Sequence, residues 1–155
     1  MATRELNQAA IDLIKSFENL ELVAYRCEAG VPSIGYGHTE TVSGDDVGKK
    51  TITEEEAERL LRLDLREAQT RLAACMPADR LASLTDNQYG ALVSFAFNAG
   101  ASPSWVVFRL IREGRLTEVP TQLRRFIWVT KKGAKVRSNG LIRRREAEVA
   151  LYLRA

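Results

Sequence analysis

Three polar side chains of different chemistry lie near the start of this 155-residue chain. Glu18, Cys27 and Ser33 follow one another at intervals of nine and six residues. A carboxyl group can donate a proton, an ionised thiol can supply a negative charge, and a hydroxyl can orient a water molecule. We therefore treat the three as a candidate catalytic group. Spacing alone does not separate a catalytic Glu18 from an exposed glutamate at a helix end.

The elements around this group are predicted from the pattern of apolar residues. Residues 7–18 repeat apolar side chains with a helical period, and Asn7 is a suitable N-cap, so a helix is expected to end at Glu18. Residues 20–26 alternate, and residues 31–36 form the expected returning strand of a hairpin. A carboxyl group at such a junction can be partly desolvated, which suits it to donate a proton.

The turn of this hairpin decides where Cys27 and Ser33 point. A three-residue turn centred on Gly30 would pair Cys27 with Ser33 and place both side chains on one face. A two-residue turn would place them on opposite faces. The sequence leaves both registers open.

The rest of the chain predicts mostly helix. Thr53 and Glu56 form a capping box that opens a long helix over residues 53–74, about 30 Å in length. Thr85 opens a second helix, apolar almost all round and therefore buried, which Gly100 ends. Further helices are expected at 104–113, 117–128 and 141–153, with a basic loop at 131–139.

These elements predict an α+β fold in a single domain, residues 1–155. A small N-terminal sheet lobe (14–52) and a helical C-terminal lobe (75–155) would be joined by a bridging helix (53–74), with the first helix at 7–18. The 45% hydrophobic fraction and the mean hydropathy of −0.21 fit a soluble domain with its own core. We find no transmembrane run, and residues 1–15 lack the pattern of a signal peptide.

Cysteine and histidine usage argues against metal chemistry. The chain has one histidine and two cysteines, too few for a zinc cluster, so we expect no metal and no cofactor. Synthesis in the cytoplasm favours reduced Cys27 and Cys75.

Four segments resemble the phage-type lysozymes, the T4-lysozyme-like glycoside hydrolases of family 24. They are SFENL (16–20), AYRCEAGVPSIGYGHT (24–39), LTDNQYGALVSFAFNAG (84–100) and GLIRRREAE (140–148), and they occur in the family's order. The resemblance implies cleavage of the β-1,4 bond between N-acetylmuramic acid and N-acetylglucosamine in peptidoglycan. It also implies a lysozyme-like fold.

The family motif has a glutamate, then an aspartate or cysteine, then a threonine, at the spacing seen here. By this resemblance Glu18 is the general acid. Cys27 stands where a carboxylate is commonest, and it could carry the same charge only if its pKa falls below about 8.5. Ser33 keeps the hydroxyl of the threonine without its methyl group.

The resemblance also implies substrate contacts from the second lobe, across the cleft, by Ser94, Phe97 and Asn98. Plain core packing is the alternative for Phe97, whereas the amide of Asn98 suits the N-acetyl groups of a glycan. His38 and Asp64 are expected to form a buried structural pair rather than to act in catalysis. Trp105 and Trp128 are expected to be core anchors.

Basic residues concentrate between positions 124 and 145. They form either a solvated helical surface or a face attracted to membrane phosphates or acidic wall polymers. Two other functions stay open: a lytic transglycosylase acting on the same bond, which needs no second carboxylate, and a basic nucleic-acid-binding module, which would leave the hairpin motif unexplained.

The lysozyme interpretation carries expectations about partners and location. Peptidoglycan glycan strands are the expected partner, nucleic acid is not, and the protein is expected to be a monomer. It would accumulate in the host cytoplasm until a holin releases it to the periplasm and the cell wall, during lysis of a Gram-negative host.

Overall fold

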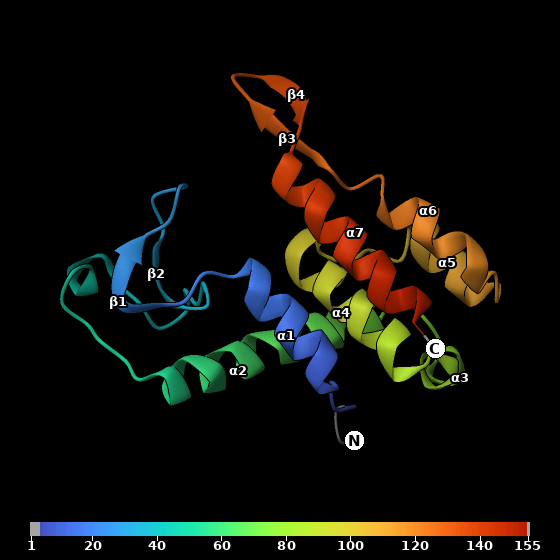
Figure 1. The fold of residues 1–155 in the computed structure, drawn as a ribbon, viewed down its shortest axis with the longest axis horizontal. Helices are drawn as coiled ribbons and strands as arrows, with labels where there is room; N and C mark the ends of the chain where they lie inside the picture. The colour runs from blue at the N-terminus through green and yellow to red at the C-terminus, as the bar shows by residue number, and fades with distance from the viewer. Residues whose placement is uncertain (1–3, 155) are drawn as a thin grey trace. The chain divides into compact units, whose positions relative to one another are not determined.

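The computed structural model describes residues 4–154 and confirms the α+β class (Figure 1). Two antiparallel hairpins stand in an otherwise helical chain. The strands are β1 (Glu21–Arg26), β2 (Pro32–Gly35), β3 (Trp128–Lys131) and β4 (Ala134–Arg137). The α-helices are α1 (Gln8–Phe17), α2 (Glu54–Ala73), α3 (Ala78–Ser83), α4 (Asp86–Ala99), α5 (Val106–Arg112), α6 (Val119–Leu123) and α7 (Asn139–Leu153). Short 3-10 helices lie at Gly44–Asp46 and Leu116–Glu118.

The chain divides into two compact units. Residues 14–67 form one, called here the sheet unit, and residues 4–13 together with 68–154 form the other, called here the helical unit. Helices α1 and α2 each contribute residues to both. The predicted single domain 1–155, with lobes at 14–52 and 75–155, stays a prediction; residues 1–3 and 155 lie outside the described residues.

Local signals in the sequence set the ends of the main helices. The Oδ1 atom of Asn7 accepts a hydrogen bond from the Ala10 N–H (3.0 Å), as predicted for the N-cap of α1. Thr53 caps α2 through the N–H of Glu56 (3.1 Å). In the capping box of α4, Thr85 and Gln88 each accept a bond from the other's N–H. The left-handed φ of +93° at Gly100 ends α4.

The sheet unit has a small core between its hairpin and α2. Ala24, Ile34 and Leu60 are buried together, with Val42 and Ile52 packed against them. Gly35 permits the close approach, because a Cβ atom there would lie 3.3 Å from the Cβ of Ala57. Outside the hairpin strands, isolated bridges pair Val23 with Thr51 and Ile34 with His38.

The helical unit is built around α4, which α7 follows along its length (Figure 1). Residues Tyr89–Ala96 of α4 are all buried, as predicted for a helix that is apolar almost all round. Phe95 lies at the centre of an aromatic cluster with Trp105, Phe108 and Phe126. The core position expected for Trp105 agrees with this cluster.

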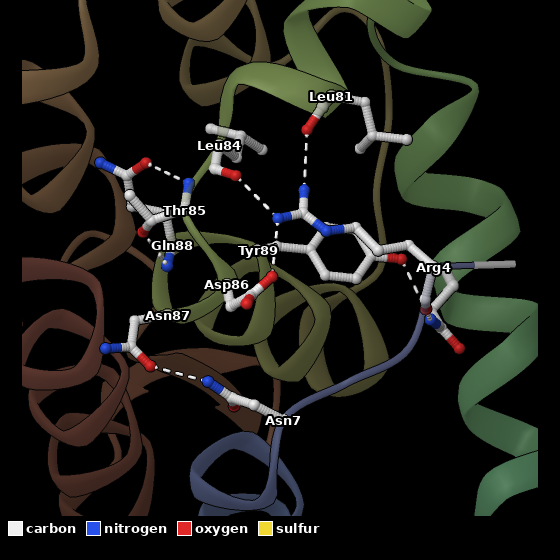
Figure 2. Close-up of polar contacts among 10 residues, drawn as sticks. Arg4, Asn7, Leu81, Leu84, Thr85, Asp86, Asn87, Gln88 and Tyr89 are labelled. Atoms are coloured by element: carbon white, nitrogen blue, oxygen red, sulfur yellow. Dashed lines mark hydrogen bonds and ion pairs between the residues drawn. The ribbon is translucent and has the colours of Figure 1, made fainter.

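The N-terminal segment belongs to the helical unit and is attached by polar contacts, which Figure 2 shows. The guanidinium of Arg4 donates to the carbonyls of Leu81 (3.0 Å) and Leu84 (2.8 Å) and pairs with Asp86 (2.9 Å). It also lies over the ring of Tyr89, 4.7 Å from the ring centre. Three residues on, the Asn7 amide donates to the side chain of Asn87 (2.8 Å).

The segment between α6 and α7 differs from the prediction. Residues 131–139 were expected to be a loop and residues 117–128 a helix, whereas α6 ends at Leu123 and the chain forms the β3–β4 hairpin. Trp128 is 52% exposed on β3, so its expected place in the core is wrong. Leu153, the last residue of α7, is also exposed.

Candidate active site

Glu18 directly follows the last residue of α1. Its N–H donates to the Ile14 carbonyl (3.1 Å), which holds the residue at the helix end, and its side chain is half-buried. Gly37 has a φ of +82°, and a Cβ atom there would lie 3.5 Å from the Oε2 atom of Glu18. The carboxyl group therefore lies against the chain just after β2, where glycine leaves it room.

The register of the β1–β2 hairpin is now fixed. The Cys27 N–H donates to the Val31 carbonyl (3.0 Å), so residues 28–30 form a three-residue turn, with Gly30 at a φ of +79°. The direct pairing of Cys27 with Ser33 is wrong, because Ser33 lies opposite Tyr25. Residues two apart on a strand share a face, so Cys27 and Ser33 still point to the same side as diagonal neighbours.

The turn also creates an electrostatic environment that favours the thiolate of Cys27. Hydrogen bonds from the backbone N–H of Val31, then from that of Ala29, lower the pKa of Cys27; the Ser33 hydroxyl adds to the effect, and partial burial opposes it. The turn thus lowers the pKa of the Cys27 thiol, which favours its charged form.

Tyr25 and Ser33 complete this face of the hairpin. Burial raises the pKa of the Tyr25 phenol first, and the negative charges of Glu21, Cys27 and Glu18 raise it further. Tyr25 is therefore a neutral phenol, and Glu21, ahead of Cys27 and Glu18, is the strongest of its charged neighbours. Ser33 is buried, and its Oγ atom donates to the Val31 carbonyl (3.0 Å).

His38 and Asp64 are in contact within the sheet unit. The Nδ1 atom of His38 lies 3.0 Å from Asp64 Oδ2 and 3.1 Å from Oδ1, and Nε2 lies 2.9 Å from the Thr41 hydroxyl. A carboxylate only accepts, so Nδ1 donates to Asp64, and Nε2 shares a hydrogen bond with the Thr41 hydroxyl. His38 is buried with both ring nitrogens bonded. That the pair serves stability rather than catalysis stays a prediction.

The helical unit holds Ser94, Phe97 and Asn98 near the C-terminal end of α4. Ser94 is 0% exposed, and its hydroxyl donates to Glu148 Oε2 (2.6 Å). Phe97 is half-buried and Asn98 is exposed. The Oδ1 atom of Asn98 accepts a hydrogen bond from Arg145 Nη2 (2.5 Å).

Arg144, Arg145 and Glu148 form a buried charged cluster, which we call the α7 cluster and which the sequence interpretation missed. Arg145 Nε lies 2.8 Å and Arg144 Nε 3.5 Å from the Glu148 carboxylate, and none of the three side chains is more than 4% exposed. Counting both arginines in a basic surface was therefore wrong. The signal was present in the spacing, because Glu148 follows them by four and three residues on one helix face.

The structure also bears on disulfide and metal chemistry. Cys27 and Cys75 are both free thiols. Within residues 4–154, no group of three or more His, Cys, Asp or Glu side chains could hold a metal ion. The same residues contain no helix with the length and apolar character to cross a bilayer.

A search of protein families matches residues 15–148 of the chain to the phage lysozyme model. The chain belongs to the phage lysozyme family. It is 33% identical over 149 residues to the endolysin of Acyrthosiphon pisum secondary endosymbiont phage 1, which covers 95% of this chain and 97% of that protein. It is 38% identical to the endolysin of Bacillus phage B103, covering 96% of this chain but only 54% of the length of that protein.

Among solved structures, the muramidase domain of SpmX from Asticaccaulis excentricus matches with a TM-score of 0.85 and 35% identity, covering 98% of this chain and 99% of that domain. The lysozyme-like α+β fold expected from the resemblance is therefore confirmed. As a phage lysozyme the chain is a glycoside hydrolase, and the motif that holds Glu18, Cys27 and Ser33 lies inside the matched residues.

Proposed function

We propose that Glu18 is the general acid with which this phage lysozyme cleaves the β-1,4 bond between N-acetylmuramic acid and N-acetylglucosamine. The chain is an endolysin that degrades peptidoglycan. The observation that carries the proposal is the position of Glu18, half-buried at the end of α1 against Gly37, in the same compact unit as Cys27. Such a carboxyl group is placed to protonate a leaving oxygen.

Cys27 supplies the negative charge opposite the acid in this proposal. Backbone N–H groups of the turn lower its pKa, so the thiolate stands in for the carboxylate that stabilises an oxocarbenium-like transition state. Ser33 supports the thiolate when its one hydroxyl proton turns from the Val31 carbonyl to the sulfur. The pKa shift and the shared strand face support these roles.

Phe97 and Asn98 are the proposed glycan contacts of the helical unit. Both are accessible, and Asn98 is the more specific of the two. Because Arg145 has only donors, the amide must turn its Oδ1 toward the arginine, which leaves its NH₂ group to donate outward to an acceptor such as an N-acetyl carbonyl. Ser94 is buried, and its proposed role is indirect, because its hydroxyl binds Glu148 of the α7 cluster.

The test of the acid is Glu18→Gln against the exposed control Glu21→Gln. On outer-membrane-permeabilised Gram-negative cells, Glu18→Gln should clear at least ~100-fold more slowly than wild type, and Glu21→Gln should match wild type, with equal circular dichroism for all three. Equal clearing by Glu18→Gln would remove Glu18 from the mechanism. Product analysis completes the test, because reducing-end muramic acid is expected and a 1,6-anhydro product would show transglycosylase chemistry instead.

The route to the wall is a further part of the proposal. This endolysin acts on the cell wall, and we propose that it waits in the host cytoplasm for a holin. Two relatives, from Pseudomonas phage phiKMV and Escherichia phage Mu, are SAR-endolysins, so the route has to be measured. Expression with and without a holin gene should give lysis only with the holin; lysis without it would refute this route.

A further inference from the structure

The β3–β4 hairpin is a short segment between α6 and α7, and its surface is unusual. The register pairs Trp128 with Arg137 and Thr130 with Lys135, and these four side chains share one face of the hairpin, which we call the Trp128 face. Trp128 is 52% exposed, and Lys135 and Arg137 are exposed beside it. An indole left in water by the fold is costly unless it has a partner to cover it.

The charge of the hairpin is wholly positive. From residue 119 to residue 145 the sequence contains no aspartate or glutamate. Among the described residues, no ion pair is found for Lys131, Lys132, Lys135 or Arg137, whereas Arg124 nearby is paired with Glu146 (2.8 Å). The hairpin therefore offers cations to an outside partner that carries anions.

The place of the hairpin in the helical unit connects this surface to the proposed glycan contacts. Phe126, two residues before Trp128, packs edge-on against Phe95 of α4 at 4.8 Å between ring centres, and Phe95 is three residues before Asn98. On the other side, α7 begins two residues after Arg137, and Arg145, which holds Asn98, lies about 9 Å further along that helix. In Figure 1 the hairpin extends from the start of α7, beyond the helices.

We propose that the Trp128 face is an accessory binding surface for peptidoglycan strands that still carry their stem peptides. The indole packs against the apolar face of a sugar ring, while Lys135 and Arg137 bind the carboxylates of the stem peptide. This inference rests on the proposed function, and it assigns contacts with the sugar and the stem peptide to named side chains of the β3–β4 hairpin.

Two other anionic partners fit the surface less well. A membrane anchor would place its indole at the tip, whereas the tip is Lys132 and Gly133, and Trp128 lies at the base of the hairpin. Single-stranded nucleic acid would be bound by successive aromatic platforms, and this face has one. A glycan strand with peptide carboxylates uses both features of the face together.

The hairpin provides its own matched control. Lys135→Gln/Arg137→Gln removes two charges from the Trp128 face, and Lys131→Gln/Lys132→Gln removes two charges from the other face and the tip. Cleavage would be measured on soluble glycan strands with stem peptides and on the same strands after an amidase has removed them. All variants should unfold at the wild-type temperature, because these side chains are exposed.

On stem-bearing strands, Lys135→Gln/Arg137→Gln should raise KM roughly five- to tenfold with kcat unchanged, and on stripped strands it should match wild type. Trp128→Ala should raise KM on both substrates, and Trp128→Phe should raise it less. Equal effects of the two double variants, or none from either, would overturn the proposal. If the wild type cleaves neither of the two substrates, the proposed function itself is refuted.

Discussion

Cys27 has a central place in the proposed mechanism. The backbone N–H groups of Val31 and Ala29 point at its sulfur because the turn is three residues long, and they lower the pKa of the thiol. A turn of another length would move these donors away. The charge at this site is therefore a property of backbone geometry as much as of the side chain.

Substitution of Cys27 should change the pH dependence of the reaction. In the proposed mechanism activity needs the Cys27 thiolate together with a protonated Glu18, so ionisation of the thiol should appear in the wild-type pH profile. Cys27→Asp ionises near pH ~3.9, so its activity should rise at lower pH than that of wild type. Cys27→Ser does not ionise in this range and should lose at least ~10-fold at every pH. The rates would be measured from pH 4.5 to 8; an unchanged profile in Cys27→Ser would show that no anion is required at this position.

The contact of His38 with Asp64 should affect stability and not catalysis. Asp64→Asn replaces the charged acceptor of the buried Nδ1 proton by a neutral amide, so the free energy of unfolding should fall by about 1–3 kcal/mol. Denaturant unfolding measures this change, with the exposed Asp45→Asn as the control expected to stay within about 0.5 kcal/mol. A folded Asp64→Asn enzyme should keep its turnover, and loss of turnover at unchanged stability would assign the pair to catalysis.

At the scale of elements, the α7 cluster attaches α7 to α4. Burial raises the pKa of Glu148, and the two guanidinium groups beside it counteract this effect. Glu148 also accepts from Ser94 on α4, and Arg145 lies over the ring of Phe95, 5.0 Å from its centre. Charged and aromatic contacts thus fix the position of α7, and with it the arginine that orients Asn98.

Removal of the central charge of this cluster should be severe. Glu148→Gln leaves two guanidinium groups buried beside a neutral amide, so the free energy of unfolding should fall by about 3–5 kcal/mol. Glu146→Gln on the same helix breaks an exposed pair with Arg124 and should cost less than about 1 kcal/mol. Thermal and denaturant unfolding of the two variants make the comparison, and similar losses would refute the buried, ionised state of Glu148.

The elements also show which parts of the fold the sequence predicts. Helices α1, α2 and α4 were predicted within about a turn because each has a capping side chain and a buried face. The β3–β4 hairpin was missed because all four residues of β4 are exposed, so no buried face imposes alternation on the sequence. Its turn has Lys132 and Gly133 at positive φ, and a lysine is not a sequence signal for this conformation.

In the candidate site, too, some features were predicted from the sequence and others were not. The residue types and the shared face of Cys27 and Ser33 followed from spacing once a three-residue turn was assumed. Their exact pairing and the N–H groups that lower the pKa of Cys27 depend on turn conformation, which the sequence left open. Arg144 and Arg145 were misplaced because long basic side chains are usually solvated, and only the packing of α7 on α4 buries them.

At the scale of the whole molecule, the N-terminal segment is part of the helical unit although it is remote in sequence from the rest of that unit. Arg4 contacts residues about 80 positions away, and the side chain of Gln69 donates to its backbone carbonyl (2.6 Å). Tyr89, beneath the Arg4 guanidinium, accepts a bond from the same glutamine. One surface arginine therefore connects the first residues to α2, α3 and α4.

Arg4→Ala should weaken the helical unit selectively. The loss of its bonds to Leu81, Leu84 and Asp86 should lower the free energy of unfolding by about 1–2 kcal/mol. Hydrogen exchange should locate faster opening in α3 and α4 and leave residues 21–35 unchanged. The neighbouring exposed Glu5→Ala should change neither; equal effects of the two substitutions would show that the segment is attached by other contacts.

Because two separate segments of the chain form the helical unit, its parts leave the ribosome at different times. At roughly 5–20 residues per second, the partners of Arg4 are synthesised several seconds after Arg4 itself, and α7 comes later still. The segment that carries Glu18, Cys27 and Ser33 is therefore complete while the helical unit still lacks most of its chain. A nascent chain arrested before α7 carries the proposed catalytic group without the packing that orients Asn98, so the proposed glycan contact of Asn98 has to wait for the last helix.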